Sequence, residues 1–130
     1  MLERFSTETI EAIFDALPVE VSFVDDTDTV RYYSKGDQRI FKRTPAVIGR
    51  KVKDCHPRQS LPKVERVISE LKAGRRNVAE FWIDLKGRKI YIRYFAVRDK
   101  TGKYIGTLEV TQDITDFQKM TGEKRLLDEE

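Results

Sequence analysis

The stretch 78–115 constrains the fold of this chain more than any other part of the sequence. It consists of three runs rich in aromatic and β-branched residues, separated by the short polar segments 86–87 and 99–102. Such runs with such breaks predict three consecutive antiparallel strands joined by tight turns. Because side chains alternate between the two faces of a strand, each run divides into two sets.

One face of this predicted sheet is almost wholly apolar and is expected to face the core. The other face is mixed, but it is too aromatic to remain wholly in water, which predicts that a helix or a second subunit covers it. The apolar face carries Ala79, Phe81, Ile83, Leu85, Ile90, Ile92, Tyr94, Ala96, Leu108, Val110 and Gln112, and the mixed face carries Glu80, Trp82, Asp84, Tyr91, Arg93, Phe95, Val97, Ile105, Thr107 and Glu109.

A helix is predicted near the N-terminus, because Ser6 and Thr7 are good capping residues and apolar residues follow at helical spacing. Pro18 ends this helix. The runs 19–24 and 30–34 then predict a β-hairpin. The apolar stripe of the helix is expected to pack on the mixed face of the sheet, and it consists of Ile10, Ile13, Phe14 and Leu17.

The middle of the chain is less regular. Residues 38–42 and 44–49 predict helices of one or two turns, and residues 51–57 form a connector. A longer helix follows, with Ser60 as its N-terminal cap and Gly74 at its C-terminal end. The stripe that this helix is expected to bury consists of Val64, Val67, Ile68 and Leu71.

This order of elements predicts an α+β fold. We expect a five-stranded antiparallel sheet with helices on its concave face, and with the N-terminal hairpin beside the last strand. At 130 residues the chain is large enough for one core. We therefore predict an N-terminal flanking helix over residues 1–18, one domain over residues 19–115 and a polar C-terminal tail over residues 116–130.

The amino-acid composition disfavours several classes of protein. A content of 39% hydrophobic and 36% charged residues is typical of a soluble globular protein, and no apolar run approaches the roughly 18 residues of a membrane span. The 25 basic and 22 acidic residues are interspersed, which disfavours nucleic-acid binding. A single cysteine excludes an internal disulfide and fits a cytoplasmic protein.

The sequence resembles the PAS sensor domain over roughly residues 10–115. The resemblance rests on the order of elements together with Gly49, the pair His56-Pro57, the turn 99–102 and the terminal DIT motif at residues 113–115. It implies a sensory or interaction module in signal transduction and not a catalyst. A signal at the inner cavity would alter the sheet and reach a partner surface or the flanking segments.

A narrower resemblance lies in the segments 30–57, 80–99 and 106–115. These resemble the C-terminal PAS domain of bacterial and archaeal proteins that carry a hemerythrin-like domain upstream. The narrower resemblance implies that such a domain is the partner of this one within a longer protein.

The predicted space between the long helix and the sheet is the first candidate site. In one interpretation it is a packed core. In the other it is an apolar pocket, in which the Tyr94 hydroxyl and the Gln112 amide orient a small ligand. The residues predicted to line it are Val64, Val67, Ile68, Leu71, Phe81, Ile83, Ile92, Tyr94, Leu108, Val110 and Gln112.

Cys55 and His56 are the only cysteine and the only histidine of the chain. Because neighbouring side chains diverge, the pair disfavours a metal site and a Cys–His catalytic pair. The resemblance leaves three interpretations open: His56 as a helix-entry residue, His56 as the axial ligand of a haem that reads a gas or redox state, and Cys55 as a redox-sensing thiol.

Two other chemistries are disfavoured. In light-sensing PAS relatives a reactive cysteine lies two residues after a Gly-Arg pair, whereas Cys55 lies further from Gly49-Arg50, which argues against a flavin photocycle. A small-molecule enzyme on a cone-like α+β fold is disfavoured because few polar residues are predicted inside.

The mixed face of the sheet is the second candidate site. Its aromatic residues, together with the N-terminal helix, predict a homodimer surface. The alternative is that the helix covers this face within one subunit. The residues predicted to form the dimer surface are Ile10, Ile13, Phe14, Leu17, Trp82, Tyr91, Phe95 and Ile105.

Overall fold

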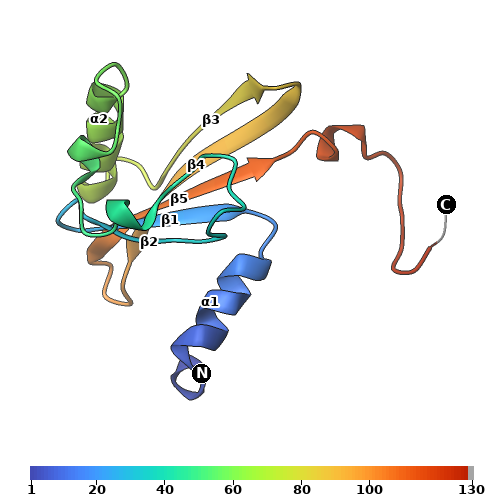
Figure 1. Ribbon diagram of the computed structural model, residues 1–130, viewed down its shortest axis with the longest axis horizontal. Helices are drawn as coiled ribbons and strands as arrows, with labels where there is room; N and C mark the ends of the chain where they lie inside the picture. The colour runs from blue at the N-terminus through green and yellow to red at the C-terminus, as the bar shows by residue number, and fades with distance from the viewer. Residues whose placement is uncertain (129–130) are drawn as a thin grey trace.

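The computed structural model describes residues 1–128. Its centre is one antiparallel sheet with the strand order β2-β1-β5-β4-β3 (Figure 1). This order confirms the predicted α+β fold, including the N-terminal hairpin beside the last strand. The strands are β1 (Glu20–Asp25), β2 (Val30–Tyr33), β3 (Val78–Leu85), β4 (Arg88–Arg98) and β5 (Tyr104–Asp113).

The N-terminal helix α1 (Thr7–Ala16) begins after Ser6, whose hydroxyl accepts a hydrogen bond of 3.0 Å from the amide of Thr9. The prediction that its stripe packs on the mixed face of its own sheet is wrong, because no residue of α1 is buried. The helix projects away from the sheet, on the side opposite α2 (Figure 1). The end of the helix contacts β2 and the residues after it. The Asp15 carboxylate accepts a hydrogen bond of 2.8 Å from the amide of Lys35, and the Phe14 ring lies 5.7 Å from the Tyr32 ring.

The long helix α2 (Leu61–Lys72) packs on the concave face of the sheet through Ile68 and Leu71, which are 7% and 0% exposed. Arg98 of β4 fastens its C-terminal end, because the guanidinium donates a hydrogen bond of 2.7 Å to the Leu71 carbonyl. Gly74 follows with a φ of 76°, which confirms the predicted C-terminal end. Ser60 is the N-cap residue, as predicted, but its side chain bonds no helix amide and donates instead to the Pro57 carbonyl.

Between β2 and α2 the chain forms only two short 3-10 turns, Pro45–Val47 and Val52–Asp54. The helix predicted over residues 38–42 is absent. Its place is taken by a buried side chain, that of Arg39, which is 4% exposed as a whole residue. Its guanidinium donates hydrogen bonds of 2.9–3.1 Å to the carbonyls of Val21, Ser34 and Phe41. These bonds attach the irregular segment to the sheet.

The negative partner of Arg39 is Glu20 of β1, with 3.2 Å between Nη2 and Oε2. The Glu20 carboxylate also accepts hydrogen bonds from the amides of Ile40 and Phe41. Burial lowers the pKa of Arg39, while the charge of Glu20 opposes that shift. This ion pair connects the strand to the segment that closes the cavity described below.

A bulge at the start of β5 decides which face each of its side chains takes. Near the turn Arg98 pairs with Tyr104, and a register that continued from there would place Leu108 opposite Tyr94. The register shifts between Val97 and Arg98, so that Glu109 lies opposite Tyr94 instead. A shift of one residue exchanges the two faces of a strand, and the predicted faces of the third run are therefore wrong.

The DIT motif ties the end of β5 to the start of β4. Asp113 accepts a hydrogen bond of 2.7 Å from Arg88 Nε and another of 2.6 Å from the Thr115 hydroxyl. The Thr115 hydroxyl in turn accepts one of 2.8 Å from the Lys89 amide. The bond from Arg88 is the main cause that lowers the pKa of Asp113 to about 2.

Beyond β5 the chain leads away from the sheet through a 3-10 turn, Phe117–Lys119 (Figure 1). Within residues 1–128, no helix has the length and apolar character that crossing a bilayer requires. The division into residues 1–18, 19–115 and 116–130 stays a prediction.

Candidate ligand-binding cavity

A cavity of about 210 Å³ lies between the concave face of the sheet, α2 and the segment after β2. Its walls combine aliphatic side chains with a polar group at the sheet. The residues that line it are Ser22, Val24, Val30, Lys42, Arg43, Thr44, Val47, Val52, Cys55, His56, Val64, Ile68, Tyr94, Thr107 and Glu109.

Three of the residues predicted for the cavity line it in the structure, namely Val64, Ile68 and Tyr94. Other residues predicted to line the cavity lie on the concave side of the sheet but do not contact the cavity. Leu71 and Ile92 are 0% and 2% exposed and fill the core. The remaining members of this group are Val67 on α2 and the β3 residues Phe81 and Ile83, of which Phe81 stacks on Tyr94 at 6.3 Å between ring centroids.

The predicted lining residues of β5 lie on the other face of the sheet. Since Glu109 pairs with Tyr94, the shift in register turns Leu108, Val110 and Gln112 away from the cavity. The Gln112 amide therefore does not orient a ligand there. Thr107 and Glu109 take these positions, and the sequence pattern missed them because it assigned the apolar set of β5 to the inside.

Glu109 is the centre of the polar group. Its side chain is 14% exposed, and Arg43 Nη2 lies 3.6 Å from its Oε1. The Tyr94 hydroxyl, also at the cavity, interacts with the same carboxylate. Burial, followed by the negative charge of Glu109, raises the pKa of Tyr94 above its ordinary value, so the phenol stays protonated as a donor.

Cys55 and His56 both lie at the cavity wall and are half-buried. His56 Nδ1 is 3.0 Å from the Val52 carbonyl, a contact that fixes the ring against the 3-10 turn before α2. This contact agrees with a helix-entry role. Within the described chain, no three histidine, cysteine, aspartate or glutamate residues cluster in a way that suits a metal ion.

The residues around His56 do not fit a haem. A pocket for a drug-sized ligand usually has a volume of roughly 300–1,000 Å³, and this cavity has about 210 Å³. The charged side chains of Lys42, Arg43 and Glu109 also line it, whereas most of the surface of a porphyrin is apolar.

A wider groove of about 760 Å³ runs along the outside of α2 and is open to solvent. Two of its lysines are bonded within the chain. Lys72 Nζ lies 2.7 Å from Asp28 Oδ1, and Lys51 Nζ donates a hydrogen bond of 2.6 Å to the Thr27 carbonyl. The cavity between α2 and the sheet is the better candidate for a small-molecule site, because six aliphatic side chains line it.

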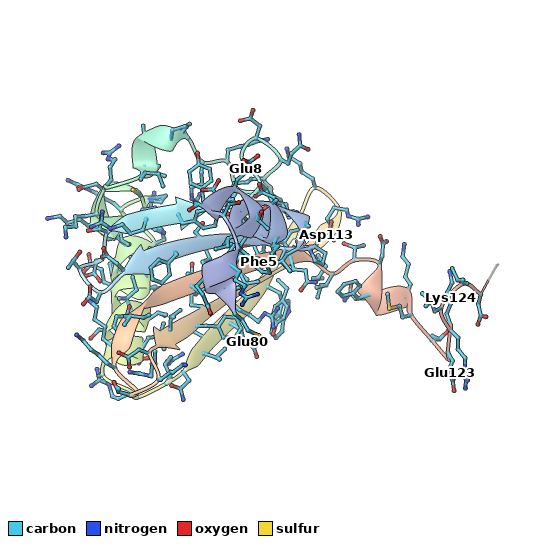
Figure 2. The ribbon with its side chains drawn as sticks, turned by 90° about the horizontal axis from the view of Figure 1, so that it is seen from below. Phe5, Glu8, Glu80, Asp113, Glu123 and Lys124 are labelled. Atoms are coloured by element: carbon cyan, nitrogen blue, oxygen red, sulfur yellow. The ribbon has the colours of Figure 1, made fainter. Side chains whose placement is uncertain are left out.

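The outer face of the sheet is aromatic, and it is most exposed at β3. The Trp82 and Tyr91 rings lie 6.3 Å apart, and Trp82 is 61% exposed. The Arg93 guanidinium lies over the rings of Tyr91 and Phe95, at 4.8 and 5.4 Å from their centroids. Figure 2 views the molecule from below, with Glu80 labelled, whose carboxylate accepts the hydrogen bond of the Tyr91 hydroxyl.

Comparison with known proteins identifies the family of this fold. A family model described as a PAS domain matches residues 10–115. The chain therefore belongs to the PAS domain family, a family of sensory modules that is typical of signal-transduction proteins. Comparison with curated proteins gives no significant match.

Solved structures give the same result. A C-terminal domain from Streptococcus mutans is 38% identical and superimposes with a TM-score of 0.83, over 88% of this chain and 90% of that one. The PAS domain of BvgS from Bordetella pertussis has 20% identity and a TM-score of 0.63, over 86% and 88% of the two chains. A PAS domain from Colwellia psychrerythraea has 15% identity and a TM-score of 0.59, over 84% and 97%.

Proposed function

We propose that this domain is a non-catalytic sensor that binds a small molecule in the cavity between α2 and the sheet. The observation that carries the proposal is the composition of that cavity. Six aliphatic side chains surround a space of about 210 Å³, and a polar group fixed on the strands lies at one side. Binding sites for small ligands combine these two features, an apolar wall for affinity and a few placed polar groups for orientation.

The same arrangement suggests how binding would be transmitted. The cavity lies between α2, which precedes β3 in the chain, and the segment that follows β2, so both of these walls are connected to strands of the sheet. A ligand that favours one arrangement of these walls shifts the population of the sheet and of the flanking segments. The haem sensor and the enzyme are not proposed, and the upstream hemerythrin-like domain stays a prediction.

Filling the cavity is expected to abolish ligand binding. Val64 is half-buried on α2 and lines the space, so Val64→Phe places a ring where the ligand would lie. Titration of wild-type protein with a set of small fragments, followed by the side-chain methyl NMR signals of Val30 and Val47, should give saturable shifts that the variant lacks.

The matched control is Val78→Phe, which adds the same ring at a 42% exposed position outside the cavity. This control should keep the shifts of the wild type. Equal titrations for the wild type and Val64→Phe would contradict the proposal.

We further propose that the domain forms a homodimer through α1 and the outer face of the sheet. Ile13 and Phe14 are 46% and 36% exposed on α1, and Trp82 and Ile105 are 61% and 39% exposed on the sheet. Since the helix covers little of this surface within its own chain, a second copy is the partner that would bury it.

A charged residue in the apolar stripe of α1 is expected to dissociate the dimer. Phe14→Glu places a charge in the middle of the stripe, and sedimentation equilibrium should show a dimer for the wild type and a monomer for the variant. Glu11→Gln, on the same helix but outside the stripe, is the control and should remain dimeric. A monomeric wild type at all concentrations would refute the proposed dimer.

A further inference from the structure

Three charged residues line the cavity, namely Lys42, Arg43 and Glu109. Lys42 Nζ donates a hydrogen bond of 3.0 Å to the Asp37 carbonyl, and the other two residues, which face each other, differ in how firmly they are held. Glu109 lies on β5, which is paired with β1 on one side and with β4 on the other. Glu109 lies opposite Ser22 of β1 and opposite Tyr94 of β4. A residue on a strand paired on both sides cannot move away without breaking the sheet, so this carboxylate is a fixed feature of the cavity.

Arg43 is held much less firmly. It lies in the segment between β2 and the turn Pro45–Val47, which forms neither helix nor strand. Its side chain is 27% exposed, and the 3.6 Å to Glu109 is longer than the 2.7–2.9 Å that is typical of a charge-assisted hydrogen bond. Its other bond goes to the carbonyl of the neighbouring Lys42, so it moves with the segment.

The carboxylate needs a cation, and Arg43 supplies one that can leave. A guanidinium that departs into water is readily hydrated, whereas a buried carboxylate without a partner is costly. A ligand with a positive head would take the place of Arg43 and keep Glu109 paired. A ligand with a negative head would lie beside the fixed carboxylate and meet like-charge repulsion.

We infer that the cavity binds a small organic cation, an ammonium or guanidinium on a short aliphatic body, whose head replaces Arg43 at Glu109. This inference rests on the proposed ligand-binding function. The head would meet the Glu109 carboxylate, with Thr107 and Tyr94 beside it, and the body would contact Val24, Val30 and Val47. Departure of Arg43 would free the part of the segment next to the turn Pro45–Val47, while the contacts of Arg39 with Glu20 keep residues 39–41 in place.

The test compares three probes of similar size and different charge: n-butylammonium, butyrate and 1-butanol. Each is titrated into wild-type protein, Arg43→Gln and Glu109→Gln, and amide chemical shifts around Thr107 report binding. The inference predicts that n-butylammonium binds the wild type best. Glu109→Gln should weaken it by about tenfold or more, the value of a hydrogen bond to a charged group.

Arg43→Gln is expected to change the affinity in the opposite direction to Glu109→Gln, because it removes the cation that competes with the ligand. It should tighten n-butylammonium binding, whereas a site for anions would lose butyrate in the same variant. Arg31→Gln and Asp84→Asn are the charge-matched controls, at side chains 56% and 78% exposed, and neither should change any affinity. Arg43 lies outside the helices and strands, and glutamine keeps a hydrogen-bond donor for Glu109. The affinities of Arg43→Gln therefore test the inference even if Glu109→Gln does not fold.

Tighter binding of butyrate than of n-butylammonium would overturn the inference, and so would weaker binding of n-butylammonium to Arg43→Gln. If butyrate or butanol saturates the cavity and n-butylammonium does not, the ligand class is wrong while the proposed function stands. If none of the three binds and Val64→Phe behaves like the wild type, both fail.

Discussion

Replacing Arg39 by alanine is expected to destabilise the domain by about 3–5 kcal/mol, the usual cost of a buried charge that loses its partner. The side chains of Arg39 and Glu20 are 0% and 3% exposed. The change leaves the Glu20 carboxylate buried without a cation, and it also removes the donor from three backbone carbonyls. Urea unfolding followed by far-UV circular dichroism measures the free energy of unfolding.

The control for this prediction is another arginine–carboxylate pair of the N-terminal hairpin. Arg31 lies 2.6 Å from Asp25, but its side chain is 56% exposed. Arg31→Ala is expected to cost about 0–1 kcal/mol, because water screens an exposed pair. If the two alanine variants lose equal free energy of unfolding, the buried pair does not hold the segment as described.

A second comparison separates the penalty of an unpaired charge from the value of the pair. The double variant Glu20→Met/Arg39→Met removes both charges and keeps apolar volume. It is expected to lose less free energy of unfolding than Arg39→Ala alone, because no charge remains without a partner.

Replacing Gly106 by alanine is expected to cost about 3 kcal/mol, at the upper end of the range for overpacking a core. A Cβ atom there would lie 2.4 Å from the Phe23 ring and 2.4 Å from the Val24 carbonyl oxygen. The ring can move, but the carbonyl belongs to the paired strand β1, so β5 itself must shift. Thermal unfolding measured by differential scanning calorimetry tests this prediction.

A double-mutant cycle with Phe23→Ala shows whether the ring or the backbone causes the loss. If the ring contributes, the double variant loses less free energy of unfolding than the two single variants added together. The carbonyl contact remains in either case, so Gly106→Ala should stay destabilising in both backgrounds. An alanine variant as stable as the wild type would contradict the close approach of β1 and β5 at the bulge.

The sequence was sufficient for the order of elements because each strand or helix has its own periodic pattern. Period-two runs with glycine turns predict β3, β4 and β5, and the Ser6 cap with the helical stripe predicts α1. These features are local, so a single sequence contains them. The strand order then follows from connection lengths and from the general rules of antiparallel sheets.

The cavity could be predicted only in part, because its composition depends on features that are not periodic. The bulge before Gly106 exchanges the faces of β5, and alternation alone placed Leu108 inside where Glu109 lies. The pairing of Glu20 with Arg39 joins a strand to the irregular segment after β2, where the sequence pattern predicts a short helix over residues 38–42. Buried polar pairs of this kind depend on tertiary contacts and leave no local signal.

The native mass spectrum of the freshly purified protein, recorded beside that of Val64→Phe, tests the central claim most directly. It reports retained ligands and the number of subunits together. The account predicts a dimer, with a defined extra mass in the wild type that is missing from the cavity-filled variant. Identical spectra for the two proteins, each with only the mass of the chain, would contradict a ligand-binding cavity.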